Sequence, residues 1–203
     1  NDEGQYTFMN IAYAQYVKGD VDLTTRVKID SRNSIVMHMG LGIAYPYGNS
    51  RILPFEKRYF SGGANGMRGW TVRTLGPGSY RSKGSNIDFI NQSGDMKLDL
   101  NVEYRSHLFW RLHSAVFVDA GNIWTLRSYK EQPGGQFAFG RFYKELAFSY
   151  GLGVRLELDM FVFRLDAAMK AVNPAYSGKD KYPIINPNFG RDFALHFAIG
   201  HPF

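Results

Sequence analysis

Apolar and polar side chains alternate along several stretches of the chain. Between residues 17 and 29 the odd positions are mainly Val, Leu and Ile, whereas the even positions carry Lys, Asp, Thr and Arg. The same alternation runs through residues 96–105 and 147–159, and again from residue 161 onward. Because successive side chains of a strand point to opposite faces, this pattern predicts strands whose two faces meet different surroundings.

The last alternating stretch, residues 192–203, places a set of apolar side chains on one face: Phe193, Leu195, Phe197, Ile199 and Phe203. Weaker alternation predicts strands at 35–45 and 112–124, and residues 6–13 could form one more short strand. The chain is therefore predicted to be all-β, with about eight antiparallel strands.

The predicted strands are about ten residues long or longer, which is the length that a tilted strand needs to cross a bilayer. Aromatic residues gather near their ends, where the interfacial girdles of membrane barrels lie: Tyr45, Tyr47, Phe109, Trp110, Trp124 and Tyr176. A transmembrane β-barrel is the favoured interpretation. A soluble lipocalin-like barrel is the alternative, and it would turn its apolar face inward and bury Phe203.

The connections between the predicted strands differ greatly in length. Residues 46–95 form a long segment rich in Gly, Pro, Ser and Asn, and residues 125–143 and 172–191 are also long. The junctions near 31–33 and 159–160 are short. Outer-membrane barrels combine short periplasmic turns with long extracellular loops, and a structureless segment as long as 46–95 is usually functional.

Composition narrows the function classes further. The 203 residues suit one domain, and no run of ~18 apolar residues predicts a membrane-spanning helix. The chain has no Cys, which excludes disulfides and thiolate metal sites. Its net charge of +6 comes from basic residues that alternate along strands, and nucleic-acid binding needs a contiguous basic stripe. The chain begins at Asn1 without a secretory signal, which indicates a mature form or a fragment.

Catalytic and metal-binding patterns are not evident in the sequence. None of the five His shows a zinc-ligand spacing. His113 and Ser114 are neighbours on a predicted strand, so they point to opposite faces and cannot form a catalytic pair directly. Neither a catalytic residue, nor a metal, nor a cofactor is predicted. Asp99, Glu157 and Asp166 are interpreted as the solvated side of the barrel wall.

The long loop contains Pro54-Phe55, then Phe60-Ser61-Gly62-Gly63, and then Met67-Arg68-Gly69-Trp70. This order resembles the sixth extracellular loop of BamA/TamA-type outer-membrane assembly factors. The core departs from that family's pattern only by Met67 in place of Val and by Trp70 in place of Phe or Tyr.

Two later stretches match the same family in the same order. Phe117, Asp119 and Gly121 resemble its Phe-x-Asp-x-Gly strand motif, and residues 191–203 resemble its C-terminal signal strand, which ends in an aromatic residue.

The resemblance implies a sixteen-stranded barrel of the bacterial outer membrane, whose first and last strands meet at a weak lateral seam. Residues 1–203 would form about the last eight strands, with the loop 46–95 folded into the lumen. Eight strands alone would enclose too little space for that loop, so we expect further strands or a second copy to complete the barrel. The implied activity is insertion of client β-barrel proteins. The implied partners are these clients, outer-membrane lipids and lipopolysaccharide, and accessory assembly proteins.

Physical chemistry predicts where Arg68 binds if the loop enters the lumen. A guanidinium cannot lose its proton, so its burial costs several kcal/mol unless carboxylates pair with it. Asp119 and Glu103 lie on the polar faces of two neighbouring predicted strands. We therefore predict that Arg68 pairs with Asp119, with Glu103 nearby, and that this locks the loop inside the barrel. The alternative is an exposed Arg68 without a partner.

The resemblance leaves several functions open. BamA-like and TamA-like roles are not distinguished, because the distinguishing periplasmic part lies outside the sequence. Two-partner secretion transporters share the Arg-Gly-aromatic loop, so a polypeptide translocator is an alternative, as are a passive pore and a structural anchor.

Overall fold

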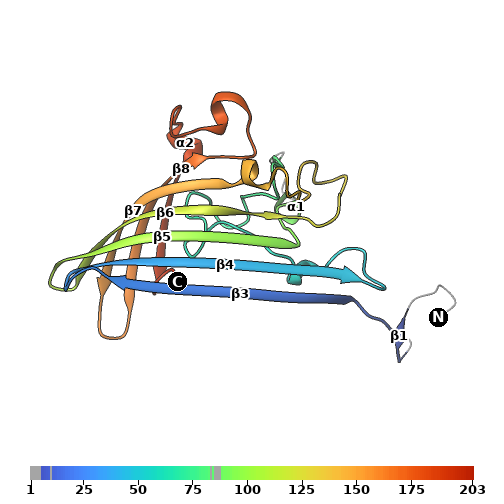
Figure 1. Cartoon of the computed structure of the whole chain (residues 1–203), viewed down its shortest axis with the longest axis horizontal. Helices are drawn as coiled ribbons and strands as arrows, with labels where there is room; N and C mark the ends of the chain where they lie inside the picture. The colour runs from blue at the N-terminus through green and yellow to red at the C-terminus, as the bar shows by residue number, and fades with distance from the viewer. Residues whose placement is uncertain (1–5, 10, 83, 85–87) are drawn as a thin grey trace.

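The computed structural model describes residues 6–9, 11–82, 84 and 88–203, and its main element is one antiparallel sheet of seven strands. The strands follow one another in sequence order, and each pairs with the next. They are β3 (Gln15–Lys28), β4 (Asn33–Tyr47), β5 (Met96–Phe109), β6 (Leu112–Trp124), β7 (Ala147–Glu157), β8 (Val162–Val172) and β9 (Phe193–Ile199). The sheet is strongly curved and open, with β3 and β9 as its two edges (Figure 1).

The N-terminal segment predicted as a possible eighth strand forms a separate hairpin. Its two strands are β1 (Thr7–Phe8) and β2 (Ile11–Ala12), which pair only with each other and lie outside the main sheet (Figure 1). The remaining elements are short helical segments in the long loops: η1 (Phe55–Lys57), α1 (Asp88–Asn91), η2 (Phe142–Glu145), η3 (Gly178–Lys181) and α2 (Phe189–Asp192). Among the described residues, no helix has the length and hydropathy to cross a membrane.

The two faces of the sheet have opposite chemistry. The outward face is apolar and exposed, as Val102 on β5, Leu152 on β7 and Phe197 on β9 illustrate. The inward face carries buried charges, among them Glu103 and Asp119, which are both 0% exposed. The prediction of a membrane barrel wall, with its apolar face outward, is therefore confirmed. A lipocalin-like barrel would have its apolar face inward.

The connections divide the sheet into two ends. Three short turns, at 29–32, 110–111 and 158–161, lie together at one end, and the long loops 48–95, 125–146 and 173–192 lie toward the other (Figure 1). The long loop 48–95 folds back against the inward face of the sheet. Its Tyr59 pairs by backbone hydrogen bonds with Gly94, and Ala44 of β4 donates its N–H to the carbonyl of Asp95.

Two aromatic residues lie elsewhere than predicted. Phe203 does not continue the lipid-facing side of the last strand, because β9 ends at Ile199 and Gly200 adopts a φ of +93°. The chain turns inward there, and the Phe203 ring stacks on His38 of β4 with a centroid distance of 5.0 Å. Trp124 is fully buried and donates its indole N–H to Glu145, so it is not part of an interfacial girdle.

Candidate functional site

The tip of the long loop is a tight turn that presents Arg68. The turn is closed by a hydrogen bond from the Trp70 N–H to the Met67 carbonyl, and Gly63 N–H donates to the Trp70 carbonyl. Gly62 and Gly63 have φ values of +98° and +95°, a conformation that favours glycine over every other residue. The glycine-rich sequence therefore allows the chain to reverse direction inside the barrel.

Arg68 and Asp119 form a bidentate ion pair. Arg68 Nε lies 2.9 Å from Asp119 Oδ2, and Nη2 lies 2.7 Å from Oδ1. The backbone N–H of Arg68 also donates to Oδ2 at 3.1 Å. Both side chains are 0% exposed. The predicted pairing is therefore present in the structure, and the alternative of an exposed Arg68 is wrong.

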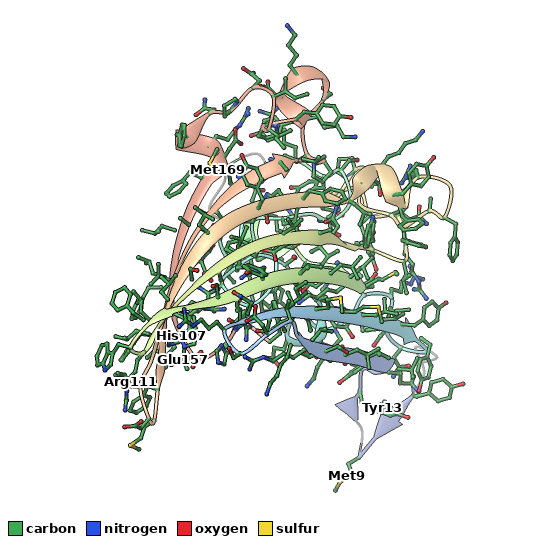
Figure 2. All side chains as sticks on the ribbon, turned by 60° about the vertical axis from the view of Figure 1, so that its left-hand side comes forward. Met9, Tyr13, His107, Arg111, Glu157 and Met169 are labelled. Atoms are coloured by element: carbon green, nitrogen blue, oxygen red, sulfur yellow. The ribbon has the colours of Figure 1, made fainter. Side chains whose placement is uncertain are left out.

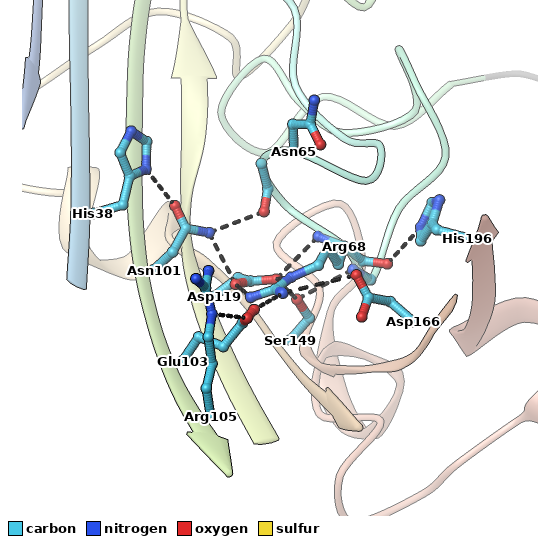
Figure 3. A network of polar contacts seen from close by, with 12 residues as sticks. His38, Asn65, Arg68, Asn101, Glu103, Arg105, Asp119, Ser149, Asp166 and His196 are labelled. Atoms are coloured by element: carbon cyan, nitrogen blue, oxygen red, sulfur yellow. Dashed lines mark hydrogen bonds and ion pairs between the residues drawn. The ribbon is translucent and has the colours of Figure 1, made fainter. Parts of the chain in front are cut away.

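Glu103 is the second carboxylate that contacts Arg68 (Figure 3). Its Oε2 lies 2.5 Å from Arg68 Nη1 and 3.1 Å from Arg155 Nη2, and its Oε1 accepts from Arg105 Nε at 2.7 Å. One carboxylate thus joins three guanidinium groups. Asp166 of β8 lies 3.9 Å from Arg68 Nη1 and also pairs with Arg155.

The strand register explains why these side chains meet. Residues opposite each other on β5 and β6 include Glu103 with Phe117 and Asn101 with Asp119, and all four point to the inward face. The Phe117 ring lies beneath the Arg68 guanidinium, whose central carbon is 3.5 Å from the ring centroid. A cation over an aromatic face is stabilising, by about 2 kcal/mol when water is excluded.

Side chains from three strands, β5, β7 and β9, hold the backbone of the loop tip (Figure 3). Asn101 of β5 donates to the Gly66 carbonyl and to Asp119. Ser149 Oγ of β7 accepts the Gly69 N–H at 3.2 Å, and His196 Nε2 of β9 donates to the Arg68 carbonyl at 2.8 Å. The loop tip therefore connects the middle of the sheet to its edge strand. We call this set of contacts around Arg68 the loop lock.

Met67, Gly69 and Trp70 support the loop lock by packing. Met67 and Trp70 are buried in one apolar cluster with Leu75 and Ala147. A Cβ atom on Gly69 would lie 2.6 Å from Ser149 Cβ, so only glycine allows the loop tip to approach β7 this closely.

The loop lock has a surplus of positive charge. Its guanidinium groups are Arg68, Arg105, Arg155 and Arg164, and its carboxylates are Glu103, Asp119 and Asp166, which gives four cations against three anions. Burial by itself would lower the pKa of Arg68, but hydrogen bonds and Coulomb attraction from Asp119 and then Glu103 outweigh it and raise this pKa. Arg68 is thus charged at every physiological pH, and the carboxylates offset that buried charge.

Sequence reasoning missed part of this site. Asp166 was interpreted as a solvated residue, yet it is 0% exposed and pairs with Arg155 and Arg164. Asp99 is also buried, at 2% exposed, whereas Glu157 is partly exposed. Ser149 and His196 carried no signal in the sequence, because their roles depend on which inward positions face the loop tip.

The site is a set of paired and buried charges. Among the described residues, no group of three or more His, Cys, Asp or Glu side chains could hold a metal ion. His113 and Ser114 point to opposite faces of β6, His113 inward toward Glu157. What the geometry can do is hold the loop in the lumen through paired buried charges.

Comparisons with known proteins identify the family. Residues 7–203 match the Omp85 superfamily domain. The chain belongs to the Omp85 superfamily. Its members include outer-membrane β-barrel proteins, and the sheet described above is a segment of such a barrel wall. This Omp85 domain therefore lies in the bacterial outer membrane.

Individual relatives agree with the family. The Omp85 domain is 25% identical over 122 residues to the outer membrane protein assembly factor BamA of Neisseria meningitidis, a match that covers 58% of this chain and 15% of that protein. In fold it resembles BamA from Haemophilus ducreyi, with a TM-score of 0.62 and 17% identity, covering 91% of this chain and 34% of that one. It also resembles CdiB from Acinetobacter baumannii, with a TM-score of 0.53 and 16% identity, covering 93% of this chain and 27% of that one. The chain thus spans about a third or less of each relative.

Proposed function

We propose that this Omp85 domain is the C-terminal part of a barrel that inserts client β-barrel proteins into the outer membrane, as the name of its BamA relative describes. Family membership supports protein insertion or translocation at the outer membrane in general. The loop lock is the observation that supports the proposal, because Arg68, in the segment that resembles the loop motif of BamA/TamA-type factors, pairs with Glu103 and Asp119.

The mechanism that we propose uses the free edges of the sheet. β9 is an edge strand whose outward side chains Leu195, Phe197 and Ile199 are exposed and suited to lipid. An unpaired edge can accept another strand through backbone hydrogen bonds, which is strand augmentation. A client strand would add at this edge, and the energy would come from client folding. Further strands would pair at β3 to complete the barrel around the loop 46–95.

The loop lock gives the barrel a rigid support beside that edge. His196 lies on β9 itself and contacts the Arg68 carbonyl, while the Arg68 side chain is fixed to β5 and β6. We therefore propose that the loop lock holds the edge strand in position for client pairing. Partners would be client barrel proteins, outer-membrane lipids, lipopolysaccharide and accessory assembly proteins.

Depletion of the protein in cells tests the proposed function. An insertase predicts that many different outer-membrane proteins decrease together, because they share one route of assembly. Depletion followed by quantitative proteomics of the outer membrane is the measurement. Restoring expression of an Arg68→Ala variant should fail to recover those proteins, whereas Arg51→Ala, at an exposed arginine of the same loop, should recover them.

A polypeptide translocator is the second candidate, since two-partner secretion transporters share the Arg-Gly-aromatic loop. For a translocator, depletion would lower only one exported polypeptide and leave the other outer-membrane proteins unchanged. That result would replace the insertase proposal. A large and steady single-channel conductance of the purified protein would instead indicate a passive pore.

A further inference from the structure

A second polar site lies on the inward side of the sheet, at the end that carries the short turns. It is a cleft of about 260 Å³ between the β3–β4 turn and the adjoining ends of β5, β6 and β7. His107 and Glu157, which line it, lie together near this end of the sheet (Figure 2). The cleft adjoins the loop lock through Arg105, which lines the cleft and pairs with Glu103.

The cleft has more positive than negative charge. Four permanent cations line it, namely Arg26, Lys28, Arg32 and Arg105. The lining carboxylates are two, Asp30 and Glu157. Because Arg105 already pairs with Glu103, the remaining surplus is one positive charge with the histidines neutral. An anionic ligand would offset this surplus.

The two carboxylates are already engaged. Asp30 accepts the backbone N–H groups of Arg32 and Asn33 at 2.7 Å each and the Asn33 amide at 2.7 Å, so it stabilises the turn. Glu157 lies 3.4 Å from His113 Nε2 and 3.8 Å from His201 Nε2. Neither carboxylate forms an ion pair with an arginine or lysine of the cleft within the part of the chain that the structure describes.

The cations of the cleft have hydrogen-bond donors that no described residue accepts. The side chains of Arg26, Lys28 and Arg32 make no hydrogen bond or ion pair with any other described residue. Arg105 is only 7% exposed, and its Nε is held by Glu103 at 2.7 Å. Its Nη2 is buried and has no hydrogen-bond partner among the described residues. A buried guanidinium donor without a partner costs free energy that a bound carboxylate would recover.

We propose that this cleft binds carboxylate groups of an acidic peptide segment that enters the barrel from its short-turn end. The charged side chains point to the inside of the barrel, whereas the outward neighbours Val27 and Tyr104 face lipid. A lipid headgroup would reach the outward side, so a peptide in the aqueous lumen is the occupant that fits. The short-turn end of an outer-membrane barrel faces the periplasm, so the segment arrives from that side.

Binding of a labelled tetraglutamate peptide to the protein in uncharged detergent tests this proposal, with fluorescence anisotropy as the readout. We expect saturable binding that tetraglutamine does not show and that weakens at least about tenfold when salt rises from ~50 to ~300 mM, because screening acts on exposed charges. The variant Arg26→Gln/Arg32→Gln should weaken binding at least about tenfold. The matched control Lys130→Gln/Lys179→Gln removes two exposed cations from the long-loop end and should leave binding unchanged.

Three results would overturn the proposal. One is equal binding of tetraglutamate by the wild type and the Arg26→Gln/Arg32→Gln variant. Another is displacement of the peptide by inorganic phosphate at an equal concentration of charge, which would indicate a general anion site. The third is binding that occurs only in nanodiscs containing anionic lipid, which would assign the surface to lipid headgroups. None of these results bears on the loop lock, so this proposal and the proposed function can fail separately.

Discussion

The Arg68 guanidinium is bound on its edge by both carboxylate oxygens of Asp119, at 2.9 and 2.7 Å, while its face lies 3.5 Å from the centroid of the Phe117 ring. Asp119 and Phe117 are two positions apart on β6, so both point to the inward face. The strand motif therefore supplies an anion and an aromatic platform to the same cation. The two contacts explain why Phe and Asp stand two positions apart in the Phe-x-Asp part of the motif.

Removing the Glu103 charge should strongly destabilise the barrel. Glu103 offsets the charges of Arg68, Arg105 and Arg155, and all four side chains are nearly or fully buried. Glu103→Gln would raise the surplus of buried positive charge from one to two. We expect a loss of about 3–5 kcal/mol in the free energy of unfolding, measured by urea titration in lipid vesicles. Glu56→Gln, at an exposed glutamate of η1, should change it little, and an equally small effect of Glu103→Gln would contradict the charge balance.

Gly69→Ala should release the loop tip without unfolding the sheet. The new Cβ would lie 2.6 Å from Ser149 Cβ, so the loop must move away from β7. We expect faster protease cleavage within residues 46–95, while the heat-induced unfolding of the barrel stays cooperative. Gly19→Ala is the matched control, because a Cβ there has no atom within 4 Å. Adding Ser149→Gly to Gly69→Ala should restore part of the protection, because it removes the clashing Cβ but also the Oγ that accepts the Gly69 N–H. No gain in protection would argue against the contact.

His196 should control the mobility of the edge strand. Its hydrogen bond to the Arg68 carbonyl is the direct link between β9 and the loop tip. His196→Ala should cost about 1 kcal/mol, which raises the local opening of β9 about fivefold. Hydrogen exchange of residues 193–199 measures this opening. His196→Gln keeps a hydrogen-bond donor and should show less than half of the effect. Equal exchange in His196→Ala and His196→Gln would show that this donor does not restrain β9.

The loop before β9 should loosen in acid. Asp192 is buried in α2, binds Arg191 through both oxygens at 2.9 Å, and accepts the Asn188 N–H at 3.0 Å. Burial would raise the pKa of Asp192, but the hydrogen bonds from Arg191 and Asn188 outweigh burial and lower it. A lowered folded-state pKa gives stability that is present above the unfolded pKa of ~3.9 and is lost as the pH falls through the folded value.

Protease cleavage of residues 173–192 as a function of pH, with an acid-active protease, measures this effect. Cleavage should accelerate below about pH 4 in the wild type. Asp192→Asn cannot titrate at this position, so its cleavage should be fast at all pH values and lose this pH dependence. A pH dependence that is the same in the variant would assign the effect to another group.

The sequence predicted the parts of this structure that depend on local pattern. Alternation located the seven strands to within a few residues, and β6 was predicted at its observed bounds. The strands need only the side-chain period of an extended chain. The pairing of Arg68 with Asp119 needed the family resemblance as well, because the resemblance placed the loop in the lumen, where a buried arginine requires carboxylates on inward positions.

Other parts of the site could not be read from the pattern. Ser149 and His196 reach the loop tip because of the register of four successive strand pairs and the path of the loop, which alternation leaves open. Asp166 and Glu157 are both carboxylates on the polar side of a predicted strand. Only Asp166 is fully buried, and it lies beside Arg68 of the loop. Phe203 fits the alternation of the last strand, but Gly200 at positive φ turns it inward. For Ser149, His196 and Asp166, contacts between segments far apart in the sequence decide what the local pattern cannot.

A double-mutant cycle between Arg68 and Asp119 tests the loop lock most directly. The variants Arg68→Gln, Asp119→Asn and the combination are compared with the wild type by the free energy of unfolding in lipid vesicles. We predict a coupling free energy of at least about 1.5 kcal/mol, because each single variant leaves a buried charge that the double variant removes. A coupling within about 0.3 kcal/mol of zero would show that the two side chains act independently and would contradict the loop lock.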